Sequence, residues 1–232
     1  MKIEIWSDVM CPFCYIGKKN FEQALDQLPF KDEVEVEWKS FQLDPTLQTG
    51  ETKTTAEYFR EKKGFPEEQA QQMTAQVVQM GKASGIEFNF EKSLITNTFP
   101  AHKILHLAKK HGKSSEMEEE LFKAHFLNGE NVGNTELLSS IAEKLGITKE
   151  EALQTLSSEE FDYDVNQDIM EGRNNGVTGV PYFILNGKYA VSGAQPAALF
   201  VEALTQTYNE TVKPFKRAKG SDLSCDTDGC SV

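Results

Sequence analysis

Two cysteines near the amino terminus have the spacing of a redox pair. Cys11 and Cys14 stand two residues apart in the sequence Cys-Pro-Phe-Cys. Proline is favoured at the first position of a helix, so Pro12 would make Cys11 the residue that caps that helix. The partial positive charge at a helix amino terminus stabilises a thiolate over a thiol. The pattern therefore predicts that Cys11 is an exposed nucleophile.

Cys14 should have different surroundings. It lies nearly one turn further into the predicted helix and is followed by Tyr15 and Ile16, so we expect it to be shielded from solvent. At this spacing it can form a disulfide with Cys11, but it is poorly placed to meet an external substrate. Cys14 is therefore the predicted resolving thiol of a dithiol site.

Two other interpretations of these cysteines stay open. They could be ordinary structural thiols, although a proline inside the pair, at a strand-to-helix junction, argues against this. They could also be half of a zinc site, because a second pair, Cys225 and Cys230, would complete a set of four thiolates. We favour redox chemistry and predict no metal, since thioredoxin-like redox sites need this Cys-x-x-Cys placement.

Composition excludes several classes of protein. The 232 residues suffice for one large domain with its own core, and four cysteines are too few for a secreted disulfide scaffold. The formal net charge of -12 disfavours nucleic acid as a partner. No secretory signal begins the chain and no apolar run is long enough to span a membrane. We expect a soluble, cytoplasmic protein without membrane contact, if this is the complete gene product.

A strand, a helix and a strand should position the first pair of cysteines. Residues 2–7 and 34–41 alternate apolar and polar side chains, and residues 12–28 have mostly helical spacing. Such a unit usually makes two parallel strands with a right-handed crossover, and its functional atoms collect at the carboxyl ends of the strands. Cys11 lies at that end.

Helices dominate the middle of the chain. Strand signals nearly vanish between residues 54 and 174, where successive helices are predicted, with caps at Asn134 or Thr135 and at Thr148. Strand patterning returns in residues 181–193 around Asn186-Gly187, a strong hairpin signal. A last helix follows in residues 195–208.

The motifs, taken in this order, resemble the DsbA-like thioredoxin-fold family, especially its FrnE-type cytoplasmic branch. The resemblance runs through most of the chain and rests on SDVMCPFCYIGK, WKSFQLDP, NTFPAHKILHLAKKHG and GVTGVPYFILNGKYAVSGAQP. It implies an α/β thioredoxin fold, a mixed sheet flanked by helices, with a large all-helical insertion between the second and third strands. Residues 1–48 and 175–213 would form the thioredoxin fold, residues 49–174 the insertion and residues 214–232 a mobile tail.

The resemblance also implies a substrate groove. In the family a cis Val-Pro bond, here Val180-Pro181, faces the reactive disulfide, and the backbone of Val180 would pair with an extended substrate. The alternative is an ordinary proline at the start of a strand. The predicted groove residues are Pro12, Phe13, Asn97, His102, Val180 and Pro181.

Phe13 departs from the family pattern. Periplasmic DsbA has a histidine between its cysteines, where it helps to hold the thiolate, and this chain has phenylalanine. We therefore expect a weaker oxidant than DsbA. The direction of electron flow stays open.

Cys225 and Cys230 form a second pair near the carboxyl end. Similar terminal pairs in some FrnE-type proteins resemble an auxiliary redox couple that exchanges with the first pair. The alternative is a solvent-exposed pair that is oxidised incidentally. Asp226 and Asp228 should disfavour their thiolates and slow their attack.

The acidic residues give weaker evidence of a catalytic role than the cysteines do. The run Glu116–Leu121 is predicted to form a solvated helix face. A charged residue that moves the proton of Cys14 is expected on the second strand, and the choice among Glu35, Glu37 and Lys39 stays open.

The sequence thus predicts a thiol:disulfide oxidoreductase that acts on a polypeptide or small-molecule thiol or disulfide. No separate cofactor is required, although glutathione is an alternative co-substrate. Two other functions stay open. One is a glutathione-dependent isomerase or transferase of the 2-hydroxychromene-2-carboxylate isomerase or kappa class, which typically has a single serine or cysteine at the position of Cys11. The other is a zinc-binding interaction module.

Overall fold

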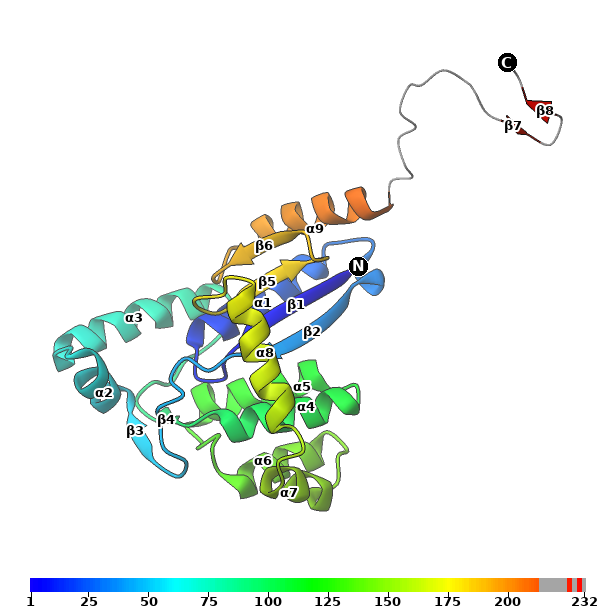
Figure 1. Cartoon of the computed structure of the whole chain (residues 1–232). Helices are drawn as coiled ribbons and strands as arrows, with labels where there is room; N and C mark the ends of the chain where they lie inside the picture. Colours follow the sequence, from blue (N-terminus) through cyan, green and yellow to red (C-terminus); the bar gives the residue numbers. More distant parts are fainter. Residues whose placement is uncertain (213–224, 227–228, 231–232) are drawn as a thin grey trace.

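The central strand of the main sheet begins at the second residue of the chain. β1 (Lys2–Ser7) lies between β2 (Glu35–Ser40) and β5 (Tyr182–Leu185), and β6 (Tyr189–Ser192) lies outside β5 (Figure 1). β1 is parallel to β2 and antiparallel to β5, which is antiparallel to β6. The computed structural model describes residues 1–212, 225–226 and 229–230.

One face of the sheet packs on two helices. Alternation in β1 directs Ile3 and Ile5 to this face, where they contact Phe21 of α1 (Pro12–Leu25) and Phe200 of α9 (Ala197–Val212). All four side chains are buried. The predicted strand-helix-strand unit is thus confirmed, and its helix lies against the sheet through its apolar side.

The predicted helical segment lies between β2 and β5. Its elements are β3 (Thr52–Thr54), α2 (Thr55–Tyr58), α3 (Glu67–Ala83), β4 (Leu94–Thr96), α4 (Phe99–Lys110), α5 (Ser114–Phe122), α6 (Thr135–Lys144), α7 (Lys149–Ser157) and α8 (Asp162–Asn174). Asn134 and Thr148 cap α6 and α7 by accepting hydrogen bonds from backbone amides, as predicted. In the described part of the chain, no helix could cross a membrane.

Two short features of this segment were not predicted. β3 and β4 pair into a small antiparallel sheet, because three-residue strands are too short to give a recognisable alternation. Two helices continue into π-helical turns, α2 into Phe59–Lys63 and α5 into Lys123–Asn128. A π-helical turn holds one more residue than an α-helical turn and is frequent at functional sites.

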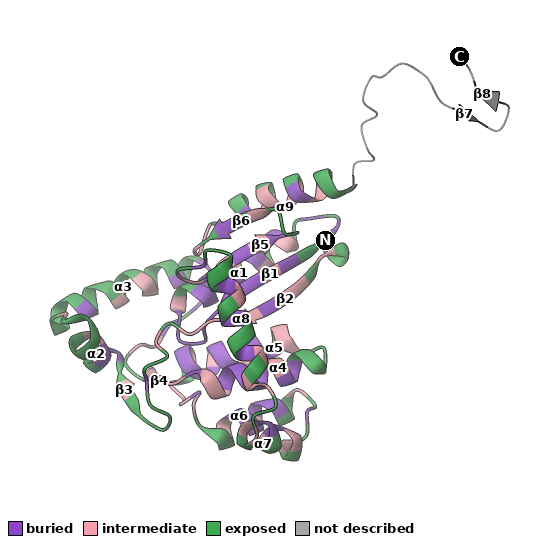
Figure 2. Ribbon diagram, in the orientation of Figure 1, coloured by how far each residue is buried: buried purple, intermediate pink, exposed green. Residues whose placement is uncertain are grey.

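Burial separates α3 from the other helices. Figure 2 shows α4 with a largely buried side, while α3 is mostly exposed. Among the residues of α3, only Ala70 and Gly81 are buried. α3 therefore forms an outer wall rather than a core element.

The predicted hairpin joins β5 to β6. Asn186 and Gly187 have positive φ angles of 52° and 65°, the conformation that a tight hairpin turn requires. Further along, β7 (Cys225–Asp226) and β8 (Gly229–Cys230) pair with Cys225 opposite Cys230. The side chains of this cysteine pair and the rest of the predicted mobile tail lie outside the described residues.

A cluster of ion pairs joins α1 to α5. Lys18 and Lys19 donate to Glu119 at 2.8 and 2.7 Å. Burial raises the pKa of Glu119, but these two bonds outweigh it and lower the pKa to about 2. The carboxylate should therefore stabilise the contact between the two helices.

Glu119→Gln should lower the free energy of unfolding at neutral pH by about 2–3 kcal/mol. The unfolded state binds the proton near the ordinary pKa of 4.5 and the folded state near 2. The stabilisation is therefore present above pH 4.5 and is lost as the pH falls toward 2. Urea unfolding at pH 7 and pH 3 measures it, with Glu120→Gln on the same helix as the control. An equal loss at both pH values would contradict this assignment.

Candidate active site

Cys11 begins α1 directly after the loop that follows β1. Its backbone is extended, with φ -92° and ψ 110°, and Pro12 is the first helical residue, as predicted. The amide of Cys11 donates to the carbonyl of Asp8 at 2.9 Å, and the amide of Cys14 donates to the carbonyl of Cys11 at 3.0 Å. The cap places the Cys11 sulfur at the carboxyl end of β1.

The exposure expected for Cys11 is wrong. The residue is only 4% exposed and Cys14 is 1% exposed, because the loop before β5 and the inserted helices cover this end of the sheet. What distinguishes the two thiols is a cavity of about 470 Å³, which Cys11 lines and Cys14 does not. A substrate can therefore reach Cys11 through the cavity.

Part of the predicted groove lies around this cavity. Pro12, Phe13 and Val180 line it together with Cys11. The Val180–Pro181 bond is cis, and the Cys11 thiol donates to the Val180 carbonyl with a distance of 3.4 Å from sulfur to oxygen. The reactive sulfur thus faces the loop before β5.

Pro181 lies behind that loop, where it meets α1. It is buried, and a Cβ atom on Gly17 would lie 2.9 Å from its Cγ. Glycine at position 17 therefore allows the helix of the two cysteines to approach Pro181 closely.

Asn97 and His102 do not line the cavity. The Asn97 amide bonds the Leu47 carbonyl and its oxygen accepts from the Phe99 amide, so the side chain fixes a loop and the start of α4. His102 is buried on α4, with Nε2 3.6 Å from Asp8 Oδ1. Both were expected in the groove because of a family-like stretch of sequence, but the hydrogen bonds of Asn97 hold it in the loop before α4, and α4 directs His102 to the protein interior.

Aromatic side chains enclose the buried side of the dithiol. Tyr15, directly after Cys14, stacks on Phe122 with ring centroids 4.9 Å apart. Phe88 and Phe126 belong to the same buried cluster. Burial raises the pKa of Cys14, as does the neighbouring Cys11, and hydrogen bonds from Asp8 and Ser7 oppose the rise only in part.

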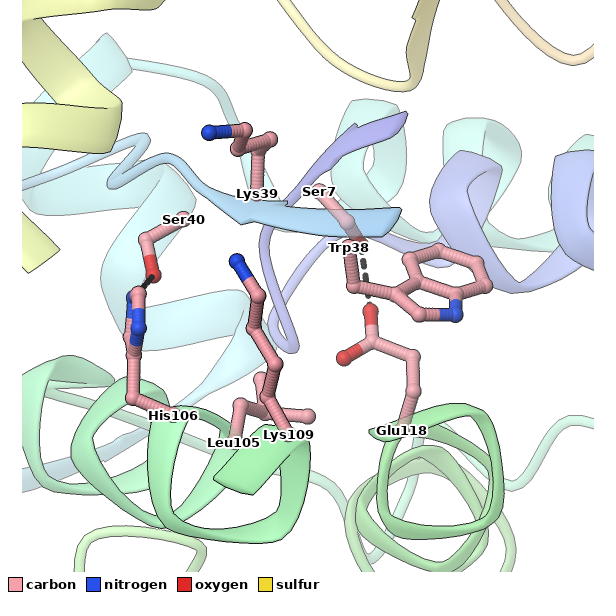
Figure 3. A pocket seen from close by; sticks show the side chains of 8 residues that line it. All are labelled: Ser7, Trp38, Lys39, Ser40, Leu105, His106, Lys109 and Glu118. Atoms are coloured by element: carbon pink, nitrogen blue, oxygen red, sulfur yellow. Dashed lines mark hydrogen bonds between the residues drawn. The ribbon is translucent and has the colours of Figure 1, made fainter. Parts of the chain in front are cut away.

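A buried carboxyl group bonds Ser7, which also contacts this thiol. Glu118 of α5 is 1% exposed and accepts a hydrogen bond from the Ser7 hydroxyl at 2.5 Å (Figure 3). Burial raises the pKa of Glu118 to about 7, although the hydrogen bond from Ser7 and the charge of Lys18 oppose the rise. Ser7 thus lies between the Cys14 thiol and a carboxyl group that titrates near neutrality.

The prediction of a solvated face for Glu116–Leu121 is wrong at Glu118. Leu121 and Phe122 follow it by three and four residues and are both buried, so the three side chains share one face of the helix. This spacing from two apolar residues was the feature of the sequence that could have predicted the burial of Glu118. Glu37 and Lys39, two of the candidates on β2, instead pair with Lys109 and Asp168.

A small cavity adjoins Glu118 and Ser7. Its volume of about 10 Å³ is close to the room that one water molecule needs. Figure 3 shows Ser40, His106, Lys109 and Glu118 on the side of β2 that faces α4 and α5, while the Lys39 side chain points to the other side of the strand. The residues that line the cavity are Ser7, Trp38, Lys39, Ser40, Leu105, His106, Lys109 and Glu118.

Among the described side chains, no three of His, Cys, Asp or Glu converge as metal ligands. The zinc interpretation needs Cys225 and Cys230, whose side chains lie outside that set.

Comparison with known proteins gives consistent matches. The family model for the DSBA-like thioredoxin domain matches residues 2–205. The uncharacterized protein YwbO of Bacillus subtilis is 30% identical over 207 residues, which cover 88% of this chain and 95% of YwbO. The crystal structure of a probable DsbA oxidoreductase from Streptomyces coelicolor is 35% identical and superimposes with a TM-score of 0.87, covering 100% of this chain and 99% of that one.

A more distant structure has the same fold. The cytosolic disulfide reductase DsbM of Pseudomonas aeruginosa, solved with GSH, is 15% identical, with a TM-score of 0.64 over 90% of this chain and 100% of that one. These matches bear out the predicted thioredoxin fold, a mixed sheet flanked by helices.

Proposed function

The chain belongs to the DSBA-like thioredoxin domain family, and from that premise we propose that it is a thiol:disulfide oxidoreductase whose reactive pair is Cys11 and Cys14. One observation carries the proposal. Cys11 caps a helix on the wall of an apolar cavity, and Cys14 lies behind it, buried and within the same helical turn. This arrangement suits one accessible sulfur and one resolving sulfur.

In the reducing direction, the Cys11 thiolate attacks one sulfur of a substrate disulfide. That disulfide breaks, a mixed disulfide forms on Cys11, and the other substrate sulfur leaves as a thiolate that takes a proton. The Cys14 thiolate then attacks the Cys11 sulfur and releases the second substrate thiol. The protein is left with a Cys11–Cys14 disulfide, and the same steps in reverse oxidise a substrate dithiol.

The second step requires Cys14 to lose its proton inside the protein. We propose that the Ser7 hydroxyl passes this proton to Glu118. Ser7 bonds Glu118 at 2.5 Å, and the pKa of Glu118 of about 7 suits a proton acceptor at neutral pH. The small cavity beyond Glu118 leads toward Lys109, whose side chain is partly exposed, and so supports exchange of the proton with solvent.

A cytoplasmic location, membership of the FrnE-type branch and an auxiliary redox role for Cys225 and Cys230 remain parts of the proposal. The relative DsbM, described as a cytosolic disulfide reductase, supports the location. In a reducing cytosol, reduction or isomerisation of disulfides needs no local oxidant, whereas net oxidation does. We therefore favour the reducing direction.

The test is whether the folded protein cycles the Cys11–Cys14 bond. A Cys225→Ser, Cys230→Ser double variant leaves only the first pair, so alkylation followed by intact mass measurement assigns every thiol. We expect two labelled thiols after dithiothreitol and none after a mild oxidant, through repeated cycles. Two labelled thiols under both conditions would reject the proposal. Stoichiometric zinc in anaerobically purified full-length protein would favour the zinc-binding module.

Substitution of Cys14 distinguishes the proposed function from the glutathione-dependent isomerase alternative. Its reaction needs one thiol or hydroxyl at position 11, so a Cys14→Ser variant would keep such an activity. We expect this variant to lose disulfide cycling. A Cys14→Ser protein that isomerises a 2-hydroxychromene-2-carboxylate with glutathione, at the rate of the wild type, would favour the alternative.

A further inference from the structure

Two buried polar side chains in the cavity beside Cys11 have no hydrogen-bond partner. His125 is 0% exposed, and neither of its ring nitrogens is bonded to any described residue. The same holds for the hydroxyl of Thr55, which is 9% exposed. Both residues line the cavity. Because burying polar groups without partners is costly, their presence here points to a ligand that supplies the missing bonds.

The ligand group that meets His125 should be neutral. Burial lowers the pKa of His125 to about 4, despite the opposing charge of Asp8, so the ring offers one donor and one acceptor at neutral pH. Lys63, which is exposed, is the one lysine or arginine among the described lining residues. A carboxylate inside the cavity could pair with this one exposed cation at most, which disfavours the two carboxylates of glutathione.

The rest of the ligand should be apolar and flat. Phe59, Val77 and Phe90 contribute to the walls, and the exposed side chains of Met73 and Met80 on α3 extend them to the surface. Methionine and aromatic side chains adapt well to the faces and edges of aromatic rings. The volume of about 470 Å³ lies within the usual range of ligand pockets, roughly 300–1,000 Å³.

The occupant must also present a sulfur to Cys11. Cys11 and Val180 line the same cavity, and the strand pairing of β5 begins two residues after Val180, at Tyr182. A substrate main chain that runs along Val180 would extend this ladder. A side chain next to the reacting cysteine would then enter the cavity.

We propose that the cavity binds a tyrosine side chain adjacent to the reacting cysteine of a polypeptide substrate. Its ring would lie against the apolar walls, and its hydroxyl would bond His125, with Thr55 as a second partner. A phenol both donates and accepts, so it can satisfy a neutral imidazole in either tautomer. This selectivity rests on the proposed thiol-disulfide exchange at Cys11.

The test compares short peptides as reductants of the oxidised protein. Capped tetrapeptides place tyrosine, phenylalanine, alanine or glutamate beside the cysteine, in both orders. The measured quantity is the second-order rate constant at pH 7. We expect tyrosine to exceed phenylalanine by about threefold to tenfold, the effect of one added hydrogen bond. Phenylalanine should exceed alanine, and glutamate and glutathione should be slowest.

A His125→Phe variant should remove the discrimination made by the hydroxyl. The ratio of tyrosine to phenylalanine rate constants should fall to about one, while the preference for phenylalanine over alanine persists. Thr55→Val should lower the same ratio in part. His111→Phe is the matched control, because His111 is exposed at the end of α4 and does not line the cavity; its ratio should equal that of the wild type.

A measurement on the wild type keeps the inference testable if the variants do not fold. N-acetyltyrosinamide should slow alkylation of Cys11 at lower concentration than N-acetylphenylalaninamide. Equal protection by the two amides, equal rates for the tyrosine and phenylalanine peptides, or fastest reaction with glutathione would overturn the inference. Dithiothreitol has no aromatic side chain for the cavity to select, so it separates the two proposals: if it also fails to exchange, the proposed function itself is wrong.

Discussion

Cys11→Ser should reduce the rate of thiol-disulfide exchange with dithiothreitol to the uncatalysed background, a loss on the order of 10³-fold or more. Cys11 is the one cysteine among the described residues that lines the cavity, so no other described sulfur can receive the attack of a substrate. The measurement is the rate at which the protein catalyses the reduction of a peptide disulfide by dithiothreitol, in the background without Cys225 and Cys230, because a Cys11→Ser protein has no Cys11–Cys14 disulfide that could oxidise dithiothreitol directly. Activity within tenfold of that background protein would contradict this role.

Cys14→Ser should behave differently. Cys11 can still attack a disulfide, but the serine hydroxyl cannot resolve the product, so a mixed disulfide should accumulate. Intact mass measurement after mixing with oxidised glutathione should find one adduct per chain, removed by dithiothreitol. If Cys11→Ser forms the adduct and Cys14→Ser does not, the two roles are reversed.

Glu118→Gln should slow the resolving step by about 10²-fold at pH 7, within the usual contribution of a general base. The amide keeps the size of the side chain and can still accept a hydrogen bond from Ser7, but it cannot take the proton of Cys14. The wild-type rate of resolution should rise with pH through an inflection near 7, and the variant should lack this inflection. Single-turnover release of a thiol from a mixed disulfide on Cys11 measures the step.

The control for this prediction is Glu116→Gln. Glu116 lies on the same helix but pairs with Lys113 at the surface, so its pH profile should match that of the wild type. Ser7→Ala should slow resolution as Glu118→Gln does, because it interrupts the path between Cys14 and the carboxyl group. An unchanged inflection in both variants would exclude the path.

Glu118→Gln should increase the stability of the protein above neutral pH, although it slows the resolving step. The folded state keeps the Glu118 proton up to about pH 7, whereas the unfolded state releases it near 4.5. Stability therefore falls as the pH rises from 4.5 to 7, by up to about 3 kcal/mol. Glu118→Gln removes this loss, so urea unfolding should find the variant more stable than the wild type at pH 8.

The sequence predicted those features that depend on short-range rules. Pro12 fixed the cap at Cys11, Asn186-Gly187 fixed the hairpin, and the cis bond at Pro181 followed from a family motif. Each is a property of a few consecutive residues. The main sheet could also be predicted, because β1 and β2 keep a regular alternation of apolar and polar side chains.

What was missed depends on contacts between distant segments. The burial of Cys11 results from covering elements that lie up to 169 residues away along the chain, such as Val180. Glu118 and His125 are polar residues on helices that also have exposed faces, and local composition alone did not indicate that they point inward. Their identification required the packing of α5 against the loop after β1.

The two π-helical turns, Phe59–Lys63 and Lys123–Asn128, each contribute residues to the cavity, among them Phe59 and His125. Loss of a single codon in the second turn would restore regular α-helical winding and change the directions of the side chains within the turn. Such a change at His125 would alter the wall of the cavity, whereas Cys11 and Cys14 belong to the start of α1, outside this turn. Gene duplicates of this protein could thereby change the partner that they accept in one step and retain their chemistry.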